Sequence, residues 1–488
     1  MSQHDTVTAL RRFGLGPKPG DMHKIASDPR GFLLSCITDK TAARIDNPDL
    51  DPSHVVYALT QEAQFTQRLG QLLLKEALKA DAGKVAAAQA PVSSGPVSSA
   101  TPPGAVSPAA AKPLTNGSPN QMRRDVLNDE LAARIERAVT TDKAFVERLV
   151  LFWSNHFCVS SAKGPVRGLV GGYEREAIRP HVLGRFATML RAVTQHPAML
   201  IYLDNQVSIG PNSRAGRNRA RGLNENLARE TLELHTLGVA GGYTQDDVTN
   251  LARLYTGWTV GQVNVERSEP GKFFFAANRH EPGDISLLGK RYTDEGQRAA
   301  EQALDDLARH PATARNIATR LARHFVSEKP PAALVAALEK TFRDSDGDLS
   351  AVARTLLTQP EVWQQGPVKI VPPYDFAVSL VRGLGLQQKP GEIVRLAGLL
   401  GQPVWQPPSP KGWPDDDDAW MGPSALRERL RIAERLARDV DRNADPRVLA
   451  ADLLGPALSE QTRQAIARSE AREQGIELLI MSPEFLRR

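Results

Sequence analysis

LNENLARETLELHTLG, residues 223–238, has the pattern of a short helix whose two ends are both encoded in the sequence. Asn224 is a good N-cap, and Glu225 suits the positive end of the helix dipole. Gly238 is the usual type of residue at which a helix stops. Three leucines at helical spacing form an apolar stripe: Leu223, Leu227 and Leu234. The stretch therefore predicts a helix that docks on the rest of the chain by one face.

The charged residues of this helix have two interpretations. Glu230 and Glu233 are three residues apart, so they share a face and can hold one cation or one proton between them. Alternatively, Glu225, Arg229 and Glu233 are spaced four apart and form an ordinary ladder of ion pairs on the helix surface. The ladder is the simpler interpretation, and the stretch alone leaves both open.

Helical patterns flank this stretch on both sides. Upstream, Thr141–Phe157 is apolar on most sides of a helix, which is typical of a buried element. His156 lies at its end and is therefore expected inside the protein. Downstream, Thr244 and Asp247 have the spacing of a capping box, which gives Asp247 a structural role.

One region carries a β pattern. Trp258–Val265 alternates between apolar and polar residues, and Lys272–Ala276 is rich in Phe, with turn residues between them. These features predict a hairpin within about 258–290. A tight turn with an imidazole and two carboxylates follows at residues 280–284, beginning with His280.

The fold class follows from these patterns. We expect a mainly α protein with a multi-helix, bundle-like body and a small β-hairpin insertion. An Ala/Pro/Ser-rich segment cannot bury enough apolar surface to fold, so it is expected to be a disordered linker. The predicted organisation has four parts. An N-terminal helical segment at residues 1–80 is followed by this linker at 81–120, by a central helical domain with the hairpin at 121–366 and by a C-terminal helical region at 367–488.

Composition excludes several classes of protein. The chain has 488 residues, more than one simple core needs, so two or three lobes are expected. Its two cysteines exclude a disulfide framework, favour a reducing compartment and are interpreted as small buried side chains. There is no apolar run of membrane-spanning length and no secretory signal at the N-terminus, so we expect a cytoplasmic protein without a membrane segment. The net charge of +5 is mild for this length.

A basic loop precedes the opening helix. Residues 204–222 carry Arg214, Arg217, Arg219 and Arg221 with no acid after Asp204. An anionic cofactor or ligand can sit there, helped by the free N–H groups at the helix start. The simpler interpretation is a solvated, mobile loop.

An aperiodic loop near the C-terminus combines aromatic and acidic residues. It contains Trp405, Trp413 and Trp420 and the acidic run Asp415–Asp418. A charge run is usually solvated, whereas three indoles in one loop are costly to leave in water. We therefore expect the tryptophans to fix the loop onto the body or to line a pocket.

The first functional hypothesis is a metal-dependent enzyme. Helical bundles build metal sites from Glu and His side chains that point inward from several helices. Candidate catalytic residues are Glu230, Glu233 and His156, and the same three with His280 are candidate ligands for Fe, Mn or Zn. A metal-bound water would then be activated for reaction. The expected supporting residues are Asn155, Trp153, Asn224, Glu225 and Arg229. No HExxH motif occurs, and each His alone is more often a core residue.

Two other hypotheses compete with the enzyme. A non-catalytic helical module would bind or mature a partner protein through the tryptophan and arginine loops, with the charged helix as a buried hydrogen-bond hub. It explains the absence from the sequence of GxSxG, P-loop and GxGxxG motifs. Nucleic-acid binding through residues 214–221 ranks last, because the loop has no interleaved aromatic residues.

Several long motifs, in order along the chain, resemble one family. They are LRRFGLGPKPGD, ERLVLFWSNHF, HPAMLIYLDN, NENLARETLELHTLG, GGYTQDDVTNLARLYTGWTV, HEPGDISLLGK and GQPVWQPP with GWPDDDDAW. The chain is similar to the bacterial proteins grouped as domain of unknown function 1800. The resemblance covers nearly the whole sequence outside 81–120. It implies a mostly helical fold, no settled activity and a sulfatase-like exported protein as partner, so that export together with this partner is an alternative to a cytoplasmic location.

Overall fold

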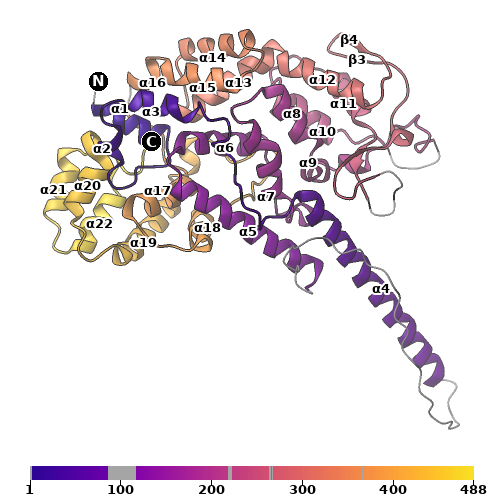
Figure 1. The fold of residues 1–488 in the computed structure, drawn as a ribbon, viewed down its shortest axis with the longest axis horizontal. Helices are drawn as coiled ribbons and strands as arrows, with labels where there is room; N and C mark the ends of the chain where they lie inside the picture. The colour runs from indigo at the N-terminus through magenta and orange to yellow at the C-terminus, as the bar shows by residue number, and fades with distance from the viewer. Residues whose placement is uncertain (1–2, 86–116, 218–221, 263–264, 266–267, 365) are drawn as a thin grey trace.

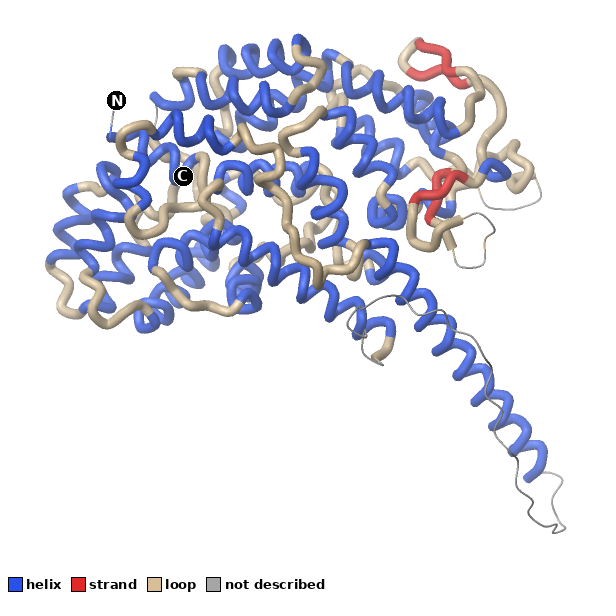
Figure 2. The backbone as a smooth tube through the Cα atoms, in the orientation of Figure 1, coloured by secondary structure: helices blue, strands red, loops and turns tan. Residues whose placement is uncertain are grey.

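The computed structural model describes residues 3–85, 117–217, 222–262, 265, 268–364 and 366–488. Helices dominate this part of the chain, and the strands form two small antiparallel hairpins (Figures 1 and 2). The predicted mainly α fold is therefore confirmed. Among the described residues, no helix is both long and apolar enough to cross a membrane.

The N-terminal helices follow one another closely along the chain, and local sequence encodes their ends. In α3, Asp28 accepts a hydrogen bond from the Gly31 backbone N–H, and Pro29 occupies the first helical position. The elements are α1 (Gln3–Val7), the π-helical turn η1 (Thr8–Arg12), α2 (Asp21–Ile25), α3 (Pro29–Cys36), α4 (Ser53–Val85) and α5 (Pro119–Thr140).

The outer part of helix α4 projects from the body (Figure 1). Large apolar side chains on it are exposed, with Phe65 at 64% and Leu72 at 60%. The predicted linker 81–120 falls mainly on residues 86–116, which lie outside the described residues. Its edges are corrected, because residues 81–85 belong to α4 and Pro119 begins α5.

The central helices follow α5. They are α6 (Ala144–His156), α7 (Val170–Tyr173), the π-helical turn η3 (Glu174–Ile178), α8 (Phe186–Gln195), α9 (Pro197–Tyr202), α10 (Asn226–Glu230), the π-helical turn η6 (Thr231–His235) and α11 (Gln245–Tyr255). Short 3₁₀ turns connect several of them: η2 (Gly164–Val166), η4 (Arg179–His181) and η5 (Asn205–Val207). The capping box of Thr244 and Asp247 forms as predicted at the start of α11.

The helix predicted at residues 223–238 is split into α10 and η6. The Asn224 side chain accepts a hydrogen bond from the Asn226 backbone N–H, 2.9 Å away, and Gly238 has a φ of 84° after the last turn. Half of the predicted charge ladder forms, because Arg229 pairs with Glu225 at 3.1 Å. The other half does not, since the π-helical turn η6 changes the register and Glu233 accepts a hydrogen bond from Tyr243.

The predicted hairpin is confirmed, and a second one follows it. Strand β1 (Trp258–Val260) pairs with β2 (Phe273–Phe275). Strand β3 (Ile285–Leu287) pairs with β4 (Lys290–Tyr292) through a turn in which both central residues have positive φ. The sequence analysis did not predict this second hairpin. Both lie at the end of the molecule opposite the C-terminal helices (Figure 2).

The remaining helices build the rest of the body. Between the second hairpin and the C-terminal region they are α12 (Gln297–Arg309), α13 (Pro311–Phe325), α14 (Ala332–Asp344), α15 (Leu349–Thr358) and α16 (Glu361–Gln364). The C-terminal helices are α17 (Pro373–Leu384), α18 (Pro390–Leu399), α19 (Pro423–Asp439), α20 (Pro446–Leu454), α21 (Glu460–Ala467) and α22 (Arg472–Ile480). The 3₁₀ turns η8 (Asp417–Ala419) and η9 (Gly455–Ala457) lie among them, and η7 (Ala277–Arg279) lies between the two hairpins. Asp445 caps α20 by accepting a hydrogen bond from the Arg447 backbone N–H.

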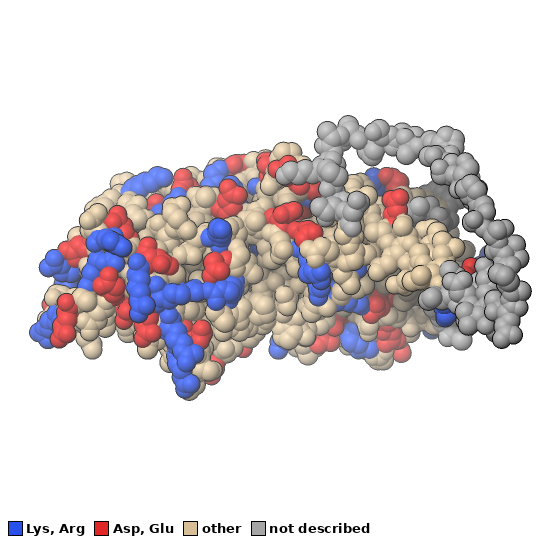
Figure 3. Space-filling model, turned by 90° about the horizontal axis from the view of Figure 1, so that it is seen from below, with Lys and Arg blue, Asp and Glu red and all other residues tan. Residues whose placement is uncertain are grey.

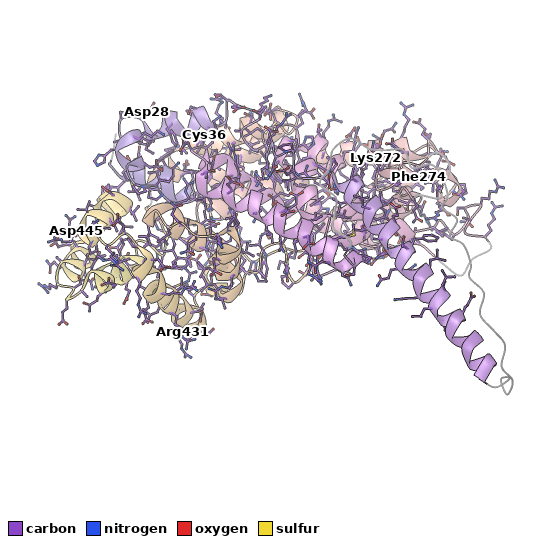
Figure 4. The ribbon with its side chains drawn as sticks, turned by 60° about the horizontal axis from the view of Figure 1, so that its bottom comes forward. Asp28, Cys36, Lys272, Phe274, Arg431 and Asp445 are labelled. Atoms are coloured by element: carbon purple, nitrogen blue, oxygen red, sulfur yellow. The ribbon has the colours of Figure 1, made fainter. Side chains whose placement is uncertain are left out.

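Two hydrophobic cores hold these elements. The first joins the N-terminal helices to the central ones through residues such as Phe13 and Trp153. The second lies under α17 to α22 and also takes Leu15, Ile135 and Ala138 from the N-terminal part. Figure 4 shows the two ends of the body, with Arg431 and Asp445 on the C-terminal helices and Lys272 and Phe274 at the first hairpin. Helices α5 and α6 contribute to both cores and so run along their boundary.

The face of the molecule shown in Figure 3 carries side chains of both charges. On the face shown in Figure 3, Lys and Arg side chains are most frequent over the C-terminal helices, where Asp and Glu side chains alternate with them. Ion pairs such as Arg395 with Glu392 and Arg447 with Asp445 account for part of this mixture. A mixed pattern of this kind is ordinary for a protein surface.

Candidate functional site

A cavity of about 100 Å³ lies where the two hydrophobic cores meet. Its walls come from α5, α6, η3, α13 and the start of α17, and the tryptophan loop, residues 401–420, closes it. A space of this size holds several water molecules or a small ligand. Among the polar side chains that line it are those of Arg134, Ser154, Glu174, His324, Tyr374 and Asp415.

Glu174 is the most heavily bonded group in the wall. Its carboxylate accepts hydrogen bonds from Ser154 Oγ at 2.6 Å and from Trp405 Nε1 at 3.0 Å. The Nε atoms of Arg134 and Arg179 each approach it to 3.0 Å. Burial is the largest single influence on its pKa and raises it, but the two guanidinium groups and the hydrogen bonds together hold the pKa at about 2. Glu174 is therefore a fixed negative charge at neutral pH.

Local sequence explains how a charged side chain reaches this depth. Glu174 begins the π-helical turn η3 and follows Gly171, Gly172 and Tyr173 of α7. A Cβ atom at Gly171 would collide with the Glu130 side chain, so only glycine lets α7 lie this close to α5. On the inner side Arg179 makes two hydrogen bonds to Glu147, at 2.6 and 2.9 Å. The ion-paired network therefore ties α5, α6 and η3 together.

Two aromatic rings and one carboxylate hold the guanidinium group of Arg134 in place. It stands over the Tyr374 ring at 4.7 Å and over the Trp405 ring at 5.1 Å. Its Nε donates to Glu174, and among the described residues this is the only hydrogen-bonding partner of the group. Arg134 is 6% exposed. Its two terminal nitrogens therefore keep donors that no described protein group uses.

Tyr374 presents a second unused polar group. It lies in the first turn of α17, where its backbone N–H donates to Gln402 Oε1 at 2.8 Å. Its side chain is 5% exposed, and its hydroxyl has no hydrogen-bond partner within the described part of the chain. Leaving a buried hydroxyl unpaired costs roughly 1–3 kcal/mol. The hydroxyl is closed off from the cavity in this structure, so a molecule in the cavity removes that cost only when the Tyr374 ring turns toward it.

The far wall of the cavity holds an imidazole and two carboxylates. His324 Nδ1 lies 3.4 Å from Asp415, and Arg148 approaches its Nε2 at 3.3 Å. Burial lowers the pKa of His324, and the neighbouring Asp415 only partly opposes this effect. Asp415 is neutralised by Lys369 at 3.1 Å, and Asp375 by Arg148 and Arg488. This wall therefore presents a neutral imidazole beside carboxylates that are already paired.

The tryptophan loop is fixed to the body and lines the cavity, so both arrangements expected for it occur. Asn155 donates to the Trp413 carbonyl at 2.9 Å and accepts from the Trp413 N–H at 2.7 Å. Trp405 has a φ of 55°, a conformation that is rare for a bulky side chain and costs about 1 kcal/mol or more. The strained residue is the one whose indole contacts Glu174 and Arg134.

The four predicted metal ligands do not converge, and this prediction is corrected. His156 Nε2 donates to the His235 carbonyl at 3.1 Å, and His280 Nδ1 donates to the Thr256 carbonyl at 2.9 Å. Each imidazole thus donates a hydrogen bond to a buried backbone carbonyl group. In the described part of the chain, no three His, Cys, Asp or Glu side chains form a group that could hold a metal ion.

Glu230 and Glu233 do influence each other, as their spacing predicts. Both are half-buried. Burial raises the pKa of Glu230, and the negative charge of Glu233 raises it further.

The predicted supporting residues have structural roles. Trp153 is buried in the first core, where its ring stacks on Phe157 at 5.8 Å, and Asn155 holds the tryptophan loop. Asn224, Glu225 and Arg229 build the start of α10 through the contacts described above.

The predicted anion site is only partly described. Arg214 and Arg217 are exposed, and Arg217 Nε donates to the Asn212 carbonyl at 3.0 Å. The described part of this loop is held in place by Glu281, which accepts from the Asn212 N–H at 2.9 Å. Arg219 and Arg221 lie outside the described residues, so anion binding by the four arginines stays a prediction.

Comparison with known proteins gives one clear match. The model of the family described as "Protein of unknown function (DUF1800)" matches residues 8–487. The chain belongs to this family. No curated protein and no solved structure matches it. The DUF1800 match thus confirms the resemblance found in the sequence and leaves the activity open.

The cavity residues of this DUF1800 protein were missed by sequence reasoning. Arg134 and Glu174 are far apart in sequence, and each fits an ordinary amphipathic helix pattern. Tyr374 follows two prolines, a signal for a helix start that carries no hint of an unpaired hydroxyl. The tryptophan loop was the one signal in the sequence that pointed to this region.

Proposed function

We propose that the protein binds a small polar molecule in the cavity between its two cores. The observation that carries the proposal is the buried Tyr374 hydroxyl, which lacks a hydrogen-bond partner among the described residues although its ring lines the cavity. Buried polar groups are nearly always hydrogen-bonded in proteins, so an unpaired one in a cavity wall points to a guest molecule.

The chemistry of the wall supports a polar guest. Arg134 offers unused N–H donors, and the neutral imidazole of His324 also lines the cavity. Apolar contact surface comes from Trp405 and Trp413 in the covering loop. Apolar walls with a few convergent polar groups are the usual composition of a small-molecule site.

The same geometry limits what Glu174 does. With its pKa held at about 2, it cannot donate a proton at neutral pH, and all its hydrogen bonds go to protein groups. Its role in the proposal is to fix the position of Arg134 and of the Trp405 indole. We therefore propose binding, and assign no acid–base step to Glu174.

A ligand screen by thermal unfolding tests the proposal. We expect small polar molecules at about 100 times their Kd to stabilise the wild type by roughly 2.7 kcal/mol. Tyr374→Phe should raise the Kd of the same compounds about tenfold, because one hydrogen bond is lost. Tyr57→Phe is the matched control, since Tyr57 lies on α4 and does not line the cavity.

Two outcomes of the screen contradict the proposal. One is that no small polar molecule changes the unfolding temperature of the wild type. The other is that Tyr374→Phe and Tyr57→Phe bind the active compounds as well as the wild type does.

Partner binding and location stay predictions. The exposed apolar residues of α4, among them Leu69, Leu72 and Leu73, favour a protein partner that covers them. A sulfatase-like exported protein is the partner that the family resemblance implies. Cys36 and Cys158 are both free and buried, in accordance with the expected reducing, cytoplasmic location.

A further inference from the structure

We infer that the ligand of the cavity carries a carboxylate group, bound by the two terminal nitrogens of Arg134 and by the Tyr374 hydroxyl. This inference rests on the proposed function and adds the chemical class of the ligand. It starts from the two wall residues whose hydrogen-bonding capacity the described protein groups leave unused.

The first step concerns the donors of Arg134. A guanidinium group has five N–H donors in one plane, and only the donor on Nε has a partner here. The four remaining donors require an acceptor. A carboxylate is an acceptor-only group with two oxygens in one plane, and it pairs with two guanidinium nitrogens at once.

The second step concerns the position of the cation. Glu174 holds Nε on one edge of the guanidinium group, and the rings of Tyr374 and Trp405 lie against it at 4.7 and 5.1 Å. The group is thus held in one orientation before a ligand arrives. Preorganisation of this kind lowers the entropy lost on binding.

The third step concerns charge. Glu174 forms ion pairs with both Arg134 and Arg179. Arg179 also forms an ion pair with Glu147, with 2.6 Å between Arg179 Nη2 and Glu147 Oε1. The pairs of Asp375 and Asp415 on the far wall are likewise complete. Arg134 is the one Arg or Lys side chain among the described residues that line the cavity, and an anion placed on its terminal nitrogens meets no unpaired carboxylate there.

The test compares carboxylates with their neutral amides by isothermal titration calorimetry at pH 7. Acetate with acetamide, propionate with propionamide and lactate with lactamide are matched in size and shape. We expect each carboxylate to bind the wild type with a Kd at least tenfold lower than that of its amide. In Tyr374→Phe both members of a pair should weaken.

Arginine variants test the donor directly. In Arg134→Lys the positive charge remains but the planar fork is lost, so the preference for the carboxylate should fall to about threefold or less. Arg175→Lys is the matched control, because Arg175 pairs with Glu130 on the same part of the fold and does not line the cavity. If Arg134→Lys does not fold, the wild-type pairs and Tyr374→Phe still decide the question.

The outcomes separate this inference from the proposed function. Amides that bind as tightly as their carboxylates overturn the inference and leave ligand binding intact. Inorganic phosphate that binds more tightly than every carboxylate also overturns it. If neither the carboxylates, the amides nor phosphate binds, and the broader screen of polar molecules is negative as well, the proposed function itself fails.

Discussion

Replacing Glu174 with glutamine should lower the free energy of unfolding by about 3–5 kcal/mol, which is the usual cost of removing one member of a buried ion pair. Glu174 is 2% exposed and joins Arg134 to Arg179. Glutamine keeps the size of the side chain but removes its charge. Arg134 then loses its only ion-pair partner among the described residues, and its guanidinium group stays buried.

Urea denaturation of the wild type and Glu174→Gln at pH 7 measures this difference. Glu460→Gln is the matched control, because Glu460 is 69% exposed and pairs with Arg463 on the surface. Its effect should stay within about 0.5 kcal/mol. A loss of less than 1 kcal/mol in Glu174→Gln would show that Glu174 does not hold the cavity wall together.

The second large effect is a loss of stability in acid that depends on Glu174. The pKa of this carboxyl group is lowered to about 2 from an ordinary value of 4.5. A lowered pKa stabilises the fold above the pKa of the unfolded chain, and this stabilisation disappears as the pH falls toward 2. The shift corresponds to about 3 kcal/mol.

Comparison of two proteins isolates this contribution from that of the other carboxylates. Unfolding free energies of the wild type and Glu174→Gln are measured between pH 7 and the lowest pH at which both remain folded. The gap between them should be constant above about pH 5 and should narrow as the pH falls below 4.5. A gap that is the same at pH 6 and pH 3 would mean that Glu174 titrates normally in the folded protein.

Local features of this fold could be predicted from sequence because their causes lie within a few residues. The capping box at Thr244 and the cap at Asp445 depend on side chains that reach backbone groups two or three positions away. The burial of His156 followed from the apolar pattern of its own helix. The first hairpin followed from alternation and turn residues within one short stretch.

The candidate site could not be predicted because contacts far apart in sequence create it. Glu174 draws its donors from Arg134 on α5, Ser154 on α6 and Trp405 in the C-terminal loop. None of these residues lies in a pattern that names its partner. The predicted metal site failed for the related reason that a buried histidine satisfies nearby backbone groups as readily as it binds a metal, as His156 and His280 do here.

The central claim is that the cavity holds a small polar ligand beside the stacked side chains of Arg134 and Tyr374. A high-resolution crystal structure of the untagged protein, grown with the tightest-binding carboxylate from the titrations, tests it most directly. We expect density for the carboxylate within hydrogen-bonding distance of the Arg134 terminal nitrogens and the Tyr374 hydroxyl. A closed cavity in which the Tyr374 hydroxyl bonds to a protein group, or a ligand bound elsewhere on the molecule, would contradict the claim.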